Sequence, residues 1–89
     1  MIARSTKKFI KSYSKSSLKI RNSFDERLKI FSNNKFDPIL NNHPLSGKYE
    51  NHRSININGD WRAIYIDMQE KGIDICLFAE MGTHSQLYK

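Results

Sequence analysis

The chain of 89 residues is long enough for one domain, residues 1–89, with a single thin hydrophobic core. Its formal net charge of +6 and its pI of about 9.6 suit a polyanionic partner. No apolar run approaches the length of a membrane span, and no apolar segment of a signal peptide follows the first residues, so we expect neither a membrane partner nor secretion.

The N-terminal part of the chain has a helical pattern after a short strand. Residues 1–4 are expected to begin the strand, and Phe9, Ile10 and Tyr13 then recur at helical spacing. A second helix is clearer, because four apolar residues fall at i, i+4, i+8 and i+11. They are Ile20, Phe24, Leu28 and Phe31.

The helical pattern ends before Pro44. Asn33 and Asn34 are expected to terminate the second helix, and the Asp37-Pro38 step marks the loop beyond it. From this point onward the chain is expected to form strands.

From Gly47 onward the apolar residues follow a period of two, which is typical of strands. Ile55 and Ile57 alternate with asparagines, and Gly59-Asp60 predicts a turn. In the next strand one face should carry Trp61, Ala63 and Tyr65, and the other Arg62, Ile64 and Ile66.

The last third of the chain predicts a hairpin. Residues 68–72 include polar and charged residues and are expected to form its loop, whereas residues 73–78 are apolar on both faces, as in a central buried strand. The resulting fold class is α+β, with two N-terminal helices packed on one face of a small, mainly antiparallel twisted sheet.

The single cysteine, Cys76, cannot form an internal disulfide. It lies in the apolar run 73–78, where a small buried residue is the ordinary interpretation. A reducing, cytoplasmic location is therefore expected.

Every charged residue before Asp25 is basic. These residues are Arg4, Lys7, Lys8, Lys11, Lys15, Lys19 and Arg21. Such a cluster suits a nucleic acid, because each cation that neutralises a phosphate releases a condensed counterion. A solvated helix face is the plain alternative. A membrane-surface helix is a further one, which the scarcity of large apolar residues between the lysines disfavours.

The polar residues do not have the spacing of a metal or cofactor site. His43, His52 and His84 lie far apart, and neither a phosphate-binding glycine loop nor a nucleophile elbow is present, so no metal or cofactor is expected. What remains is acid–base chemistry on a polyanion. Cleavage of RNA without a metal needs a base, an acid and cations around the phosphorane.

The C-terminal half contains each of these residue types in a specific order. The ordered blocks are 42–47 (Asn-His-Pro-Leu-Ser-Gly), 52–55 (His-Arg-Ser-Ile), 59–65 (Gly-Asp-Trp-Arg-Ala-Ile-Tyr) and 82–88 (Gly-Thr-His-Ser-Gln-Leu-Tyr). In this order they resemble the YafQ branch of the RelE/ParE toxin superfamily. The resemblance is close over the last half of the chain, whereas the first half matches only in its plan of a strand and two helices.

The resemblance implies a RelE-like fold and a toxin of a type II toxin–antitoxin system. Members of this branch are ribosome-dependent, metal-independent mRNA endonucleases that cut A-site codons and inhibit translation. The implied partners are therefore the ribosome, mRNA and a cognate acidic antitoxin that covers or displaces the catalytic surface.

Site residues follow from the same blocks. His84 matches the tail histidine that donates a proton, and His43 and Asp60 match residues implicated at the active site. Tyr88 stands where a phenylalanine is usual and can still stack on a base. Arg53 matches an arginine of the second strand.

Two positions depart from the family pattern. Asn56 stands in place of a histidine and cannot exchange protons near neutrality, and Glu80 stands in place of an arginine that faces the phosphate. Glu80 fits catalysis if it is the general base, and we then expect it to pair with Arg53 or Arg62. The expected RNA contacts are Arg53, Arg62, Lys7, Lys8, Lys11, Lys15 and Lys19.

Two other functions stay open at this point. The first is a catalytically impaired RelE-fold protein that still binds RNA or its antitoxin, which Asn56 and Glu80 motivate. The second is a ParE-like gyrase inhibitor, which would have no use for a histidine such as His84 in its tail. Single residues also have ordinary interpretations, since a Gly-Asp step is common in turns and Trp61 suits a core.

Overall fold

The computed structural model describes residues 1–88, and these contain a five-stranded sheet of order β1-β5-β4-β3-β2. β1 and β5 are parallel, and the other neighbouring strands are antiparallel. The strands are β1 (Ile2–Ser5), β2 (His43–Pro44), β3 (Arg53–Asn58), β4 (Trp61–Glu70) and β5 (Ile73–Thr83). The predicted α+β class with a mainly antiparallel sheet is confirmed.

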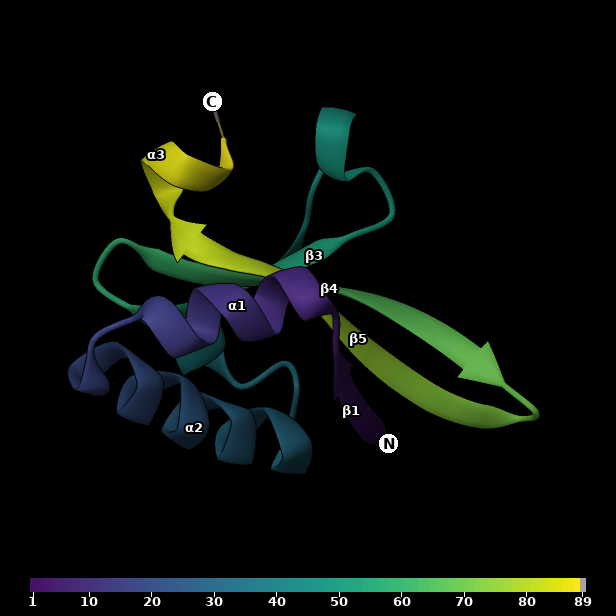
Figure 1. Ribbon diagram of the computed structural model, residues 1–89. Coiled ribbons are helices and arrows are strands. Elements are labelled where there is room, and N and C mark those ends of the chain that lie inside the picture. The colour runs from purple at the N-terminus through teal and green to yellow at the C-terminus, as the bar shows by residue number, and fades with distance from the viewer. Residues whose placement is uncertain (89) are drawn as a thin grey trace.

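Two helices, α1 (Lys7–Lys15) and α2 (Leu18–Asn33), cover one face of the sheet (Figure 1). Each begins at a hydroxyl cap, because the side chain of Thr6 accepts a hydrogen bond from Phe9 N–H and that of Ser17 accepts one from Ile20 N–H. Asn34 is the C-cap of α2, as predicted. Beyond it, Pro38–Leu40 forms one 3₁₀ turn, η1.

The main core is a cluster of aromatic rings around Phe78 of β5. Its ring centroid lies 5.7 Å from that of Phe9, 5.5 Å from those of Phe24 and Phe31, and 5.6 Å from that of Tyr65. The apolar stripe of the second helix therefore faces the core as predicted. Each such ring contributes roughly 1.5–3 kcal/mol by burial.

A second, smaller core lies on the opposite face of the sheet. It consists of Tyr49, Ile64 and Leu87, with Leu45 and Tyr88 packed against them. It is covered by the 3₁₀ turn η2 (Gly47–Tyr49) and the short helix α3 (His84–Leu87). The predicted alternation along β4 is confirmed, since neighbouring residues of that strand enter different cores.

The α3 helix was not predicted from the sequence of residues 82–88. A capping box begins it, in which the Thr83 hydroxyl accepts from Gln86 N–H and the Gln86 side chain accepts from Thr83 N–H. This signal is present in the sequence as Thr-x-x-Gln.

The predicted loop over residues 68–72 is wrong. β4 continues to Glu70 and only Lys71 and Gly72 form the turn, both with positive φ (52° and 79°), as a type I′ hairpin turn requires. The polar side chains are tolerated because the hairpin projects away from the helices (Figure 1). Gln69 also donates a hydrogen bond to Asp74 across the strands at 2.9 Å.

The prediction of a strand buried on both faces over residues 73–78 holds only in part. Ile73 is 49% exposed because it lies in the projecting hairpin, whereas Ile75, Cys76 and Phe78 are buried. Of the apolar residues that indicated helix α1, Phe9 is buried and Ile10 is exposed.

Candidate active site

The residues predicted for catalysis gather mainly on the sheet face opposite α1 and α2. One row of pairs crosses four strands, with His43 opposite Ser54, Ser54 opposite Ile64, and Ile64 opposite Glu80. Directly paired residues of antiparallel strands project to the same face. Ile64 belongs to the second core, so this row faces η2 and α3.

His84 and Asp60 are brought together at one end of this face. The His84 N–H donates a hydrogen bond to the Asp60 carbonyl at 3.0 Å, which holds the start of α3 against the β3–β4 turn. Both side chains are exposed. The His84 ring lies 4.7 Å from the ring of Tyr88. The structure therefore brings the backbones of Asp60 and His84 together and places the Tyr88 ring beside the His84 imidazole.

Arg62 lies beside the same turn. Its Nη1 donates to the carbonyl oxygens of Gly59 at 2.7 Å and Trp61 at 3.0 Å. A guanidinium has five N–H donors, so these contacts leave donors for a phosphate. Opposite it in β3 is Asn56.

Asn56 and Ser54 carry buried oxygens on this face. Among residues 1–88, neither Asn56 Oδ1 nor Ser54 Oγ has a hydrogen-bond partner. Buried polar atoms without partners are uncommon in folded proteins, and a catalytic role is one explanation for them. Position 56, where the family pattern has a histidine, is therefore polar and lies beside Arg62.

Glu80 is held by two donors. Lys8 of α1 forms an ion pair with Oε1, and the Tyr49 hydroxyl donates to Oε2. The predicted ion pair with Arg53 or Arg62 is wrong, since α1 runs along β5 beyond the end of β1 and presents Lys8 instead.

The environment keeps Glu80 ionised. Burial favours a higher pKa for its carboxyl, but the hydrogen bonds from Lys8 and Tyr49 and the charges of Lys8 and Lys48 outweigh burial, and the pKa lies below its ordinary value. The Tyr49 hydroxyl stays protonated, because burial and the bond to Glu80 both raise its pKa. Tyr49 is therefore a neutral donor to a carboxylate.

Tyr49 connects the two parts of the site. Its ring centroid lies 5.9 Å from that of Tyr88, which in turn contacts His84, while its hydroxyl reaches Glu80. Sequence reasoning missed Tyr49 because it falls between the ordered blocks. The signal that could have identified it is the presence of one aromatic residue within the polar segment 46–52.

A cavity of about 410 Å³ opens next to Glu80, between α1 and α3. It is lined by Lys8, Ser12, Lys15, Ser16, Lys48, Tyr49, Trp61, Glu80, Met81, Gln86 and Leu87. His84 and Asp60 do not line it, although Gln86 and Leu87 of helix α3 do. Lys48 is a second residue that the sequence did not single out.

The predicted RNA-binding lysines divide into two sets. All are exposed on α1 or α2. Lys8 and Lys15 line the cavity, whereas Lys7, Lys11 and Lys19 do not. The first set is therefore the one that faces the candidate site.

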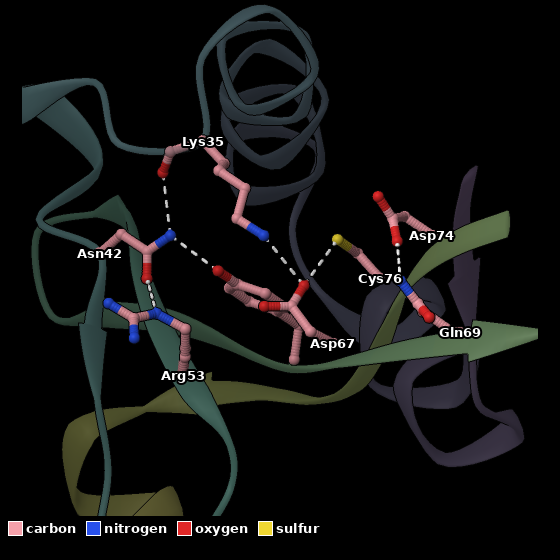
Figure 2. A network of polar contacts seen from close by, with 8 residues as sticks. Lys35, Asn42, Arg53, Asp67, Gln69, Asp74 and Cys76 are labelled. Carbon is pink, nitrogen blue, oxygen red and sulfur yellow. Dashed lines mark hydrogen bonds and ion pairs between the residues drawn. The ribbon is translucent and has the colours of Figure 1, made fainter. Parts of the chain in front are cut away.

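Arg53 lies on the other face of the sheet, in a polar network (Figure 2). Its Nε donates to Asn42 Oδ1 at 2.7 Å, and its guanidinium lies 5.4 Å from the ring centroid of Phe36. Asn42 in turn donates to the Tyr65 hydroxyl at 2.7 Å. The structure thus separates Arg53 from His84 and gives it contacts that stabilise the fold.

The same network continues to the cysteine (Figure 2). Lys35 Nζ lies 3.0 Å from Asp67 Oδ1, and the Cys76 thiol donates to the same oxygen at 3.2 Å. Burial, with the bond to Asp67, raises the pKa of the Cys76 thiol to about 11. The predicted burial of Cys76 is confirmed.

His43 is on the edge strand β2. Its Nδ1 lies 2.8 Å from the carbonyl oxygen of Asn41. It shares the sheet face with Glu80 but is separated from it by β3 and β4.

Within residues 1–88, no three His, Cys, Asp or Glu side chains gather closely enough to hold a metal ion. Over the same residues no helix combines the length and apolarity needed to cross a membrane.

Comparisons with known proteins agree with this fold. A family model described as "Bacterial toxin of type II toxin-antitoxin system, YafQ" matches residues 1–89. YafQ from E. coli strain BL21(DE3) has a TM-score of 0.78 and 20% identity, covering 98% of this chain and 97% of that chain. A YoeB/ParE toxin from Agrobacterium tumefaciens has a TM-score of 0.76 and 14% identity, covering 94% and 99%.

The E. coli DinJ-YafQ complex gives a further match, with a TM-score of 0.71, 20% identity and coverage of 98% and 97%. These structural matches show the RelE-like fold. The search of curated proteins found no significant match.

Proposed function

The chain belongs to the YafQ family of bacterial type II toxins, and we propose on that premise that it is a metal-independent endoribonuclease that cuts mRNA at the ribosomal A site. Residues 1–89 act as one toxin domain, and translation stops because the message is cut.

The contact between α3 and the β3–β4 turn supports this proposal best. It gathers His84, Asp60, Arg62 and Tyr88 at one exposed edge, where a bound strand of RNA can reach all four. An exposed edge suits a substrate that is itself held in place by the ribosome. Tyr88 stacks on a base of the A-site codon.

The reaction uses acid–base chemistry alone. A base takes the proton of the 2′-hydroxyl, and the 2′-oxygen attacks the adjacent phosphorus. The bond from phosphorus to the 5′-oxygen then breaks, and His84 donates a proton to that leaving oxygen, which leaves a 2′,3′-cyclic phosphate and a 5′-hydroxyl. Arg62 stabilises the charge that develops on the phosphorane.

Asp60 is the better base of the two carboxylates. It is exposed beside His84, whereas both oxygens of Glu80 are engaged by Lys8 and Tyr49. Glu80 acts as the base only if it is released from these two donors. His43 supports the site from the edge strand.

The partners follow from the charge and from the family. The exposed lysines of α1 and α2 contact ribosomal RNA, and an acidic antitoxin neutralises the net charge of +6. The existence of a DinJ-YafQ complex supports an antitoxin partner for this chain. A protein that acts on translating ribosomes works in the cytoplasm, where the Cys76 thiol stays reduced.

A second candidate is a catalytically silent toxin that binds the ribosome without cutting. Asn56 favours it, because its amide cannot exchange protons near neutrality. Glu80 favours it too, because a carboxylate stands on the face that binds the phosphate.

The test is cleavage on programmed ribosomes by the wild type, by His84→Gln and by His52→Gln as a matched histidine control. Ribosome-dependent cuts that vanish only in His84→Gln are expected. Ribosome binding without cuts would support the silent alternative. DNA cleavage complexes of gyrase without loss of message would support the ParE-like alternative.

A further inference from the structure

Glu80 stands where its surroundings favour an anion. Its side chain is only 12% exposed, and its two oxygens accept from Lys8 and from the Tyr49 hydroxyl. Lys48 adds a further positive charge close enough to lower the Glu80 pKa. These groups form a pocket with two donors and an excess of cations.

The cavity beside it is basic apart from Glu80. Lys8, Lys15 and Lys48 line it, and Glu80 is the acidic residue among its lining side chains. Trp61 and Gln86 complete the wall with an aromatic surface and an amide. Glu80 neutralises only one of these three lysines, so the lining of the cavity keeps a net positive charge.

We propose that Glu80 is an internal anion that occupies a phosphate-binding pocket formed by Lys8, Lys48 and Tyr49, and that a phosphate group of single-stranded RNA takes its place. This inference rests on the proposed RNA substrate and adds a second contact to it, separate from the edge that bears His84.

The chemistry of the donors suits this exchange. A carboxylate presents two oxygens to Lys8 and Tyr49, and the two non-bridging oxygens of a phosphodiester can accept from the same donors. The Lys8 side chain is 71% exposed, so it has room to follow either anion. The cavity offers space for the nucleotide, and its Trp61 wall offers a surface for a base.

The exchange has a predictable effect on affinity. While Glu80 remains in the pocket, it repels the incoming phosphate and engages the cation that should bind it. Removal of this one charge should tighten binding about three- to tenfold, from the interaction of two unit charges roughly 6 Å apart in a partly hydrated site. The salt dependence should also steepen, because Lys8 becomes available to release a counterion.

The experiment uses the single tryptophan of the chain, Trp61, as a fluorescent reporter in the cavity. The wild type, Glu80→Gln and Glu70→Gln are titrated with a short single-stranded DNA oligonucleotide, which has phosphates but no 2′-hydroxyl to react, and separately with inorganic phosphate. Glu70→Gln is the matched control, because Glu70 also pairs with one cation, Arg4, but lies on the exposed hairpin. Both variants gain the same net charge.

A three- to tenfold gain in oligonucleotide affinity for Glu80→Gln, with less than twofold for Glu70→Gln, is expected. The same ratio with inorganic phosphate would identify the phosphate as the recognised group, and a ratio seen with the oligonucleotide alone would assign recognition to the nucleotide. Equal affinities for both variants and the wild type would overturn the inference.

A second pair of variants tests the pocket independently, in case Glu80→Gln does not fold. Lys8→Met should weaken binding at least threefold, whereas Lys11→Met, on the same helix outside the cavity, should change it less. Similar losses in both would overturn the pocket. Ribosome-dependent cleavage is measured in parallel. Absence of cutting would count against the proposed endonuclease, whereas unchanged oligonucleotide affinities would count against the phosphate-binding pocket.

Discussion

Tyr49→Phe tests whether the site is organised through the Tyr49 hydroxyl. The substitution keeps the ring, which packs in the second core, and removes only the donor to Glu80. A hydrogen bond to a charged group contributes about 1.5–3 kcal/mol when both partners are shielded from water. Tyr49 is buried and the Glu80 side chain is 12% exposed, so we expect a loss in this range.

The coupling to Glu80 is the sharper part of this prediction. In the Glu80→Gln background the same hydroxyl meets a neutral amide, and its removal should cost only about 0.5–1.5 kcal/mol. The double-mutant cycle should therefore give an interaction energy of about 1 kcal/mol or more.

The assay is urea unfolding of the four proteins, with thermal melting as a check, where 1 kcal/mol corresponds to about 4–8 °C in a domain of this size. Tyr13→Phe is the matched control, because the Tyr13 hydroxyl donates to Asp25 at 2.8 Å on the exposed surface and should contribute less. A Tyr49→Phe cost equal to that of Tyr13→Phe, or one unchanged by Glu80→Gln, would refute the reasoning.

The remaining predictions concern the core, the carboxylate and the thiol. Phe78→Ala should cost about 3–5 kcal/mol in urea unfolding, because Phe78 contacts four other rings, whereas Ile73→Ala on the exposed hairpin should cost less than about 1 kcal/mol. The folded pKa of Glu80 lies below its unfolded value of about 4.3, so its contribution to stability is present above that pH and is lost as the pH falls through the folded pKa. Glu80→Gln should flatten the pH dependence of unfolding in this acid range, and an unchanged slope would contradict the ion pair. The pKa of about 11 predicts that native Cys76 reacts with a thiol reagent at neutral pH far more slowly than the unfolded chain does, and equal rates would contradict its burial.

Periodicity predicted the parts of the fold that depend on a buried face. The stripe of α2 and the alternation along β4 each face a core, so the sequence pattern and the packing agree. The β4–β5 hairpin was misjudged because the residues near its tip are exposed, and polar residues in a projecting strand look like a loop. There the turn conformation of Lys71 and Gly72, rather than burial, sets the boundary.

The proximity of His84 and Asp60 could be anticipated from the ordered blocks, and the two residues meet through the backbone contact of α3. The pairing of Glu80 with Lys8 could not be predicted from the sequence. It depends on how α1 runs along β5, which brings Lys8 to a strand more than seventy positions later. Tyr49 was hidden for the same reason, because its contacts to Tyr88 and Glu80 arise only when η2 folds over the sheet.

The most direct test of the endonuclease proposal is the chemistry of the RNA ends at ribosome-dependent cuts. Attack by the 2′-oxygen with His84 as the acid predicts a 2′,3′-cyclic phosphate on the upstream fragment and a 5′-hydroxyl on the downstream one, with cutting lost in His84→Gln. Upstream fragments ending in a 3′-hydroxyl, or cutting that persists in His84→Gln, would contradict the proposed mechanism.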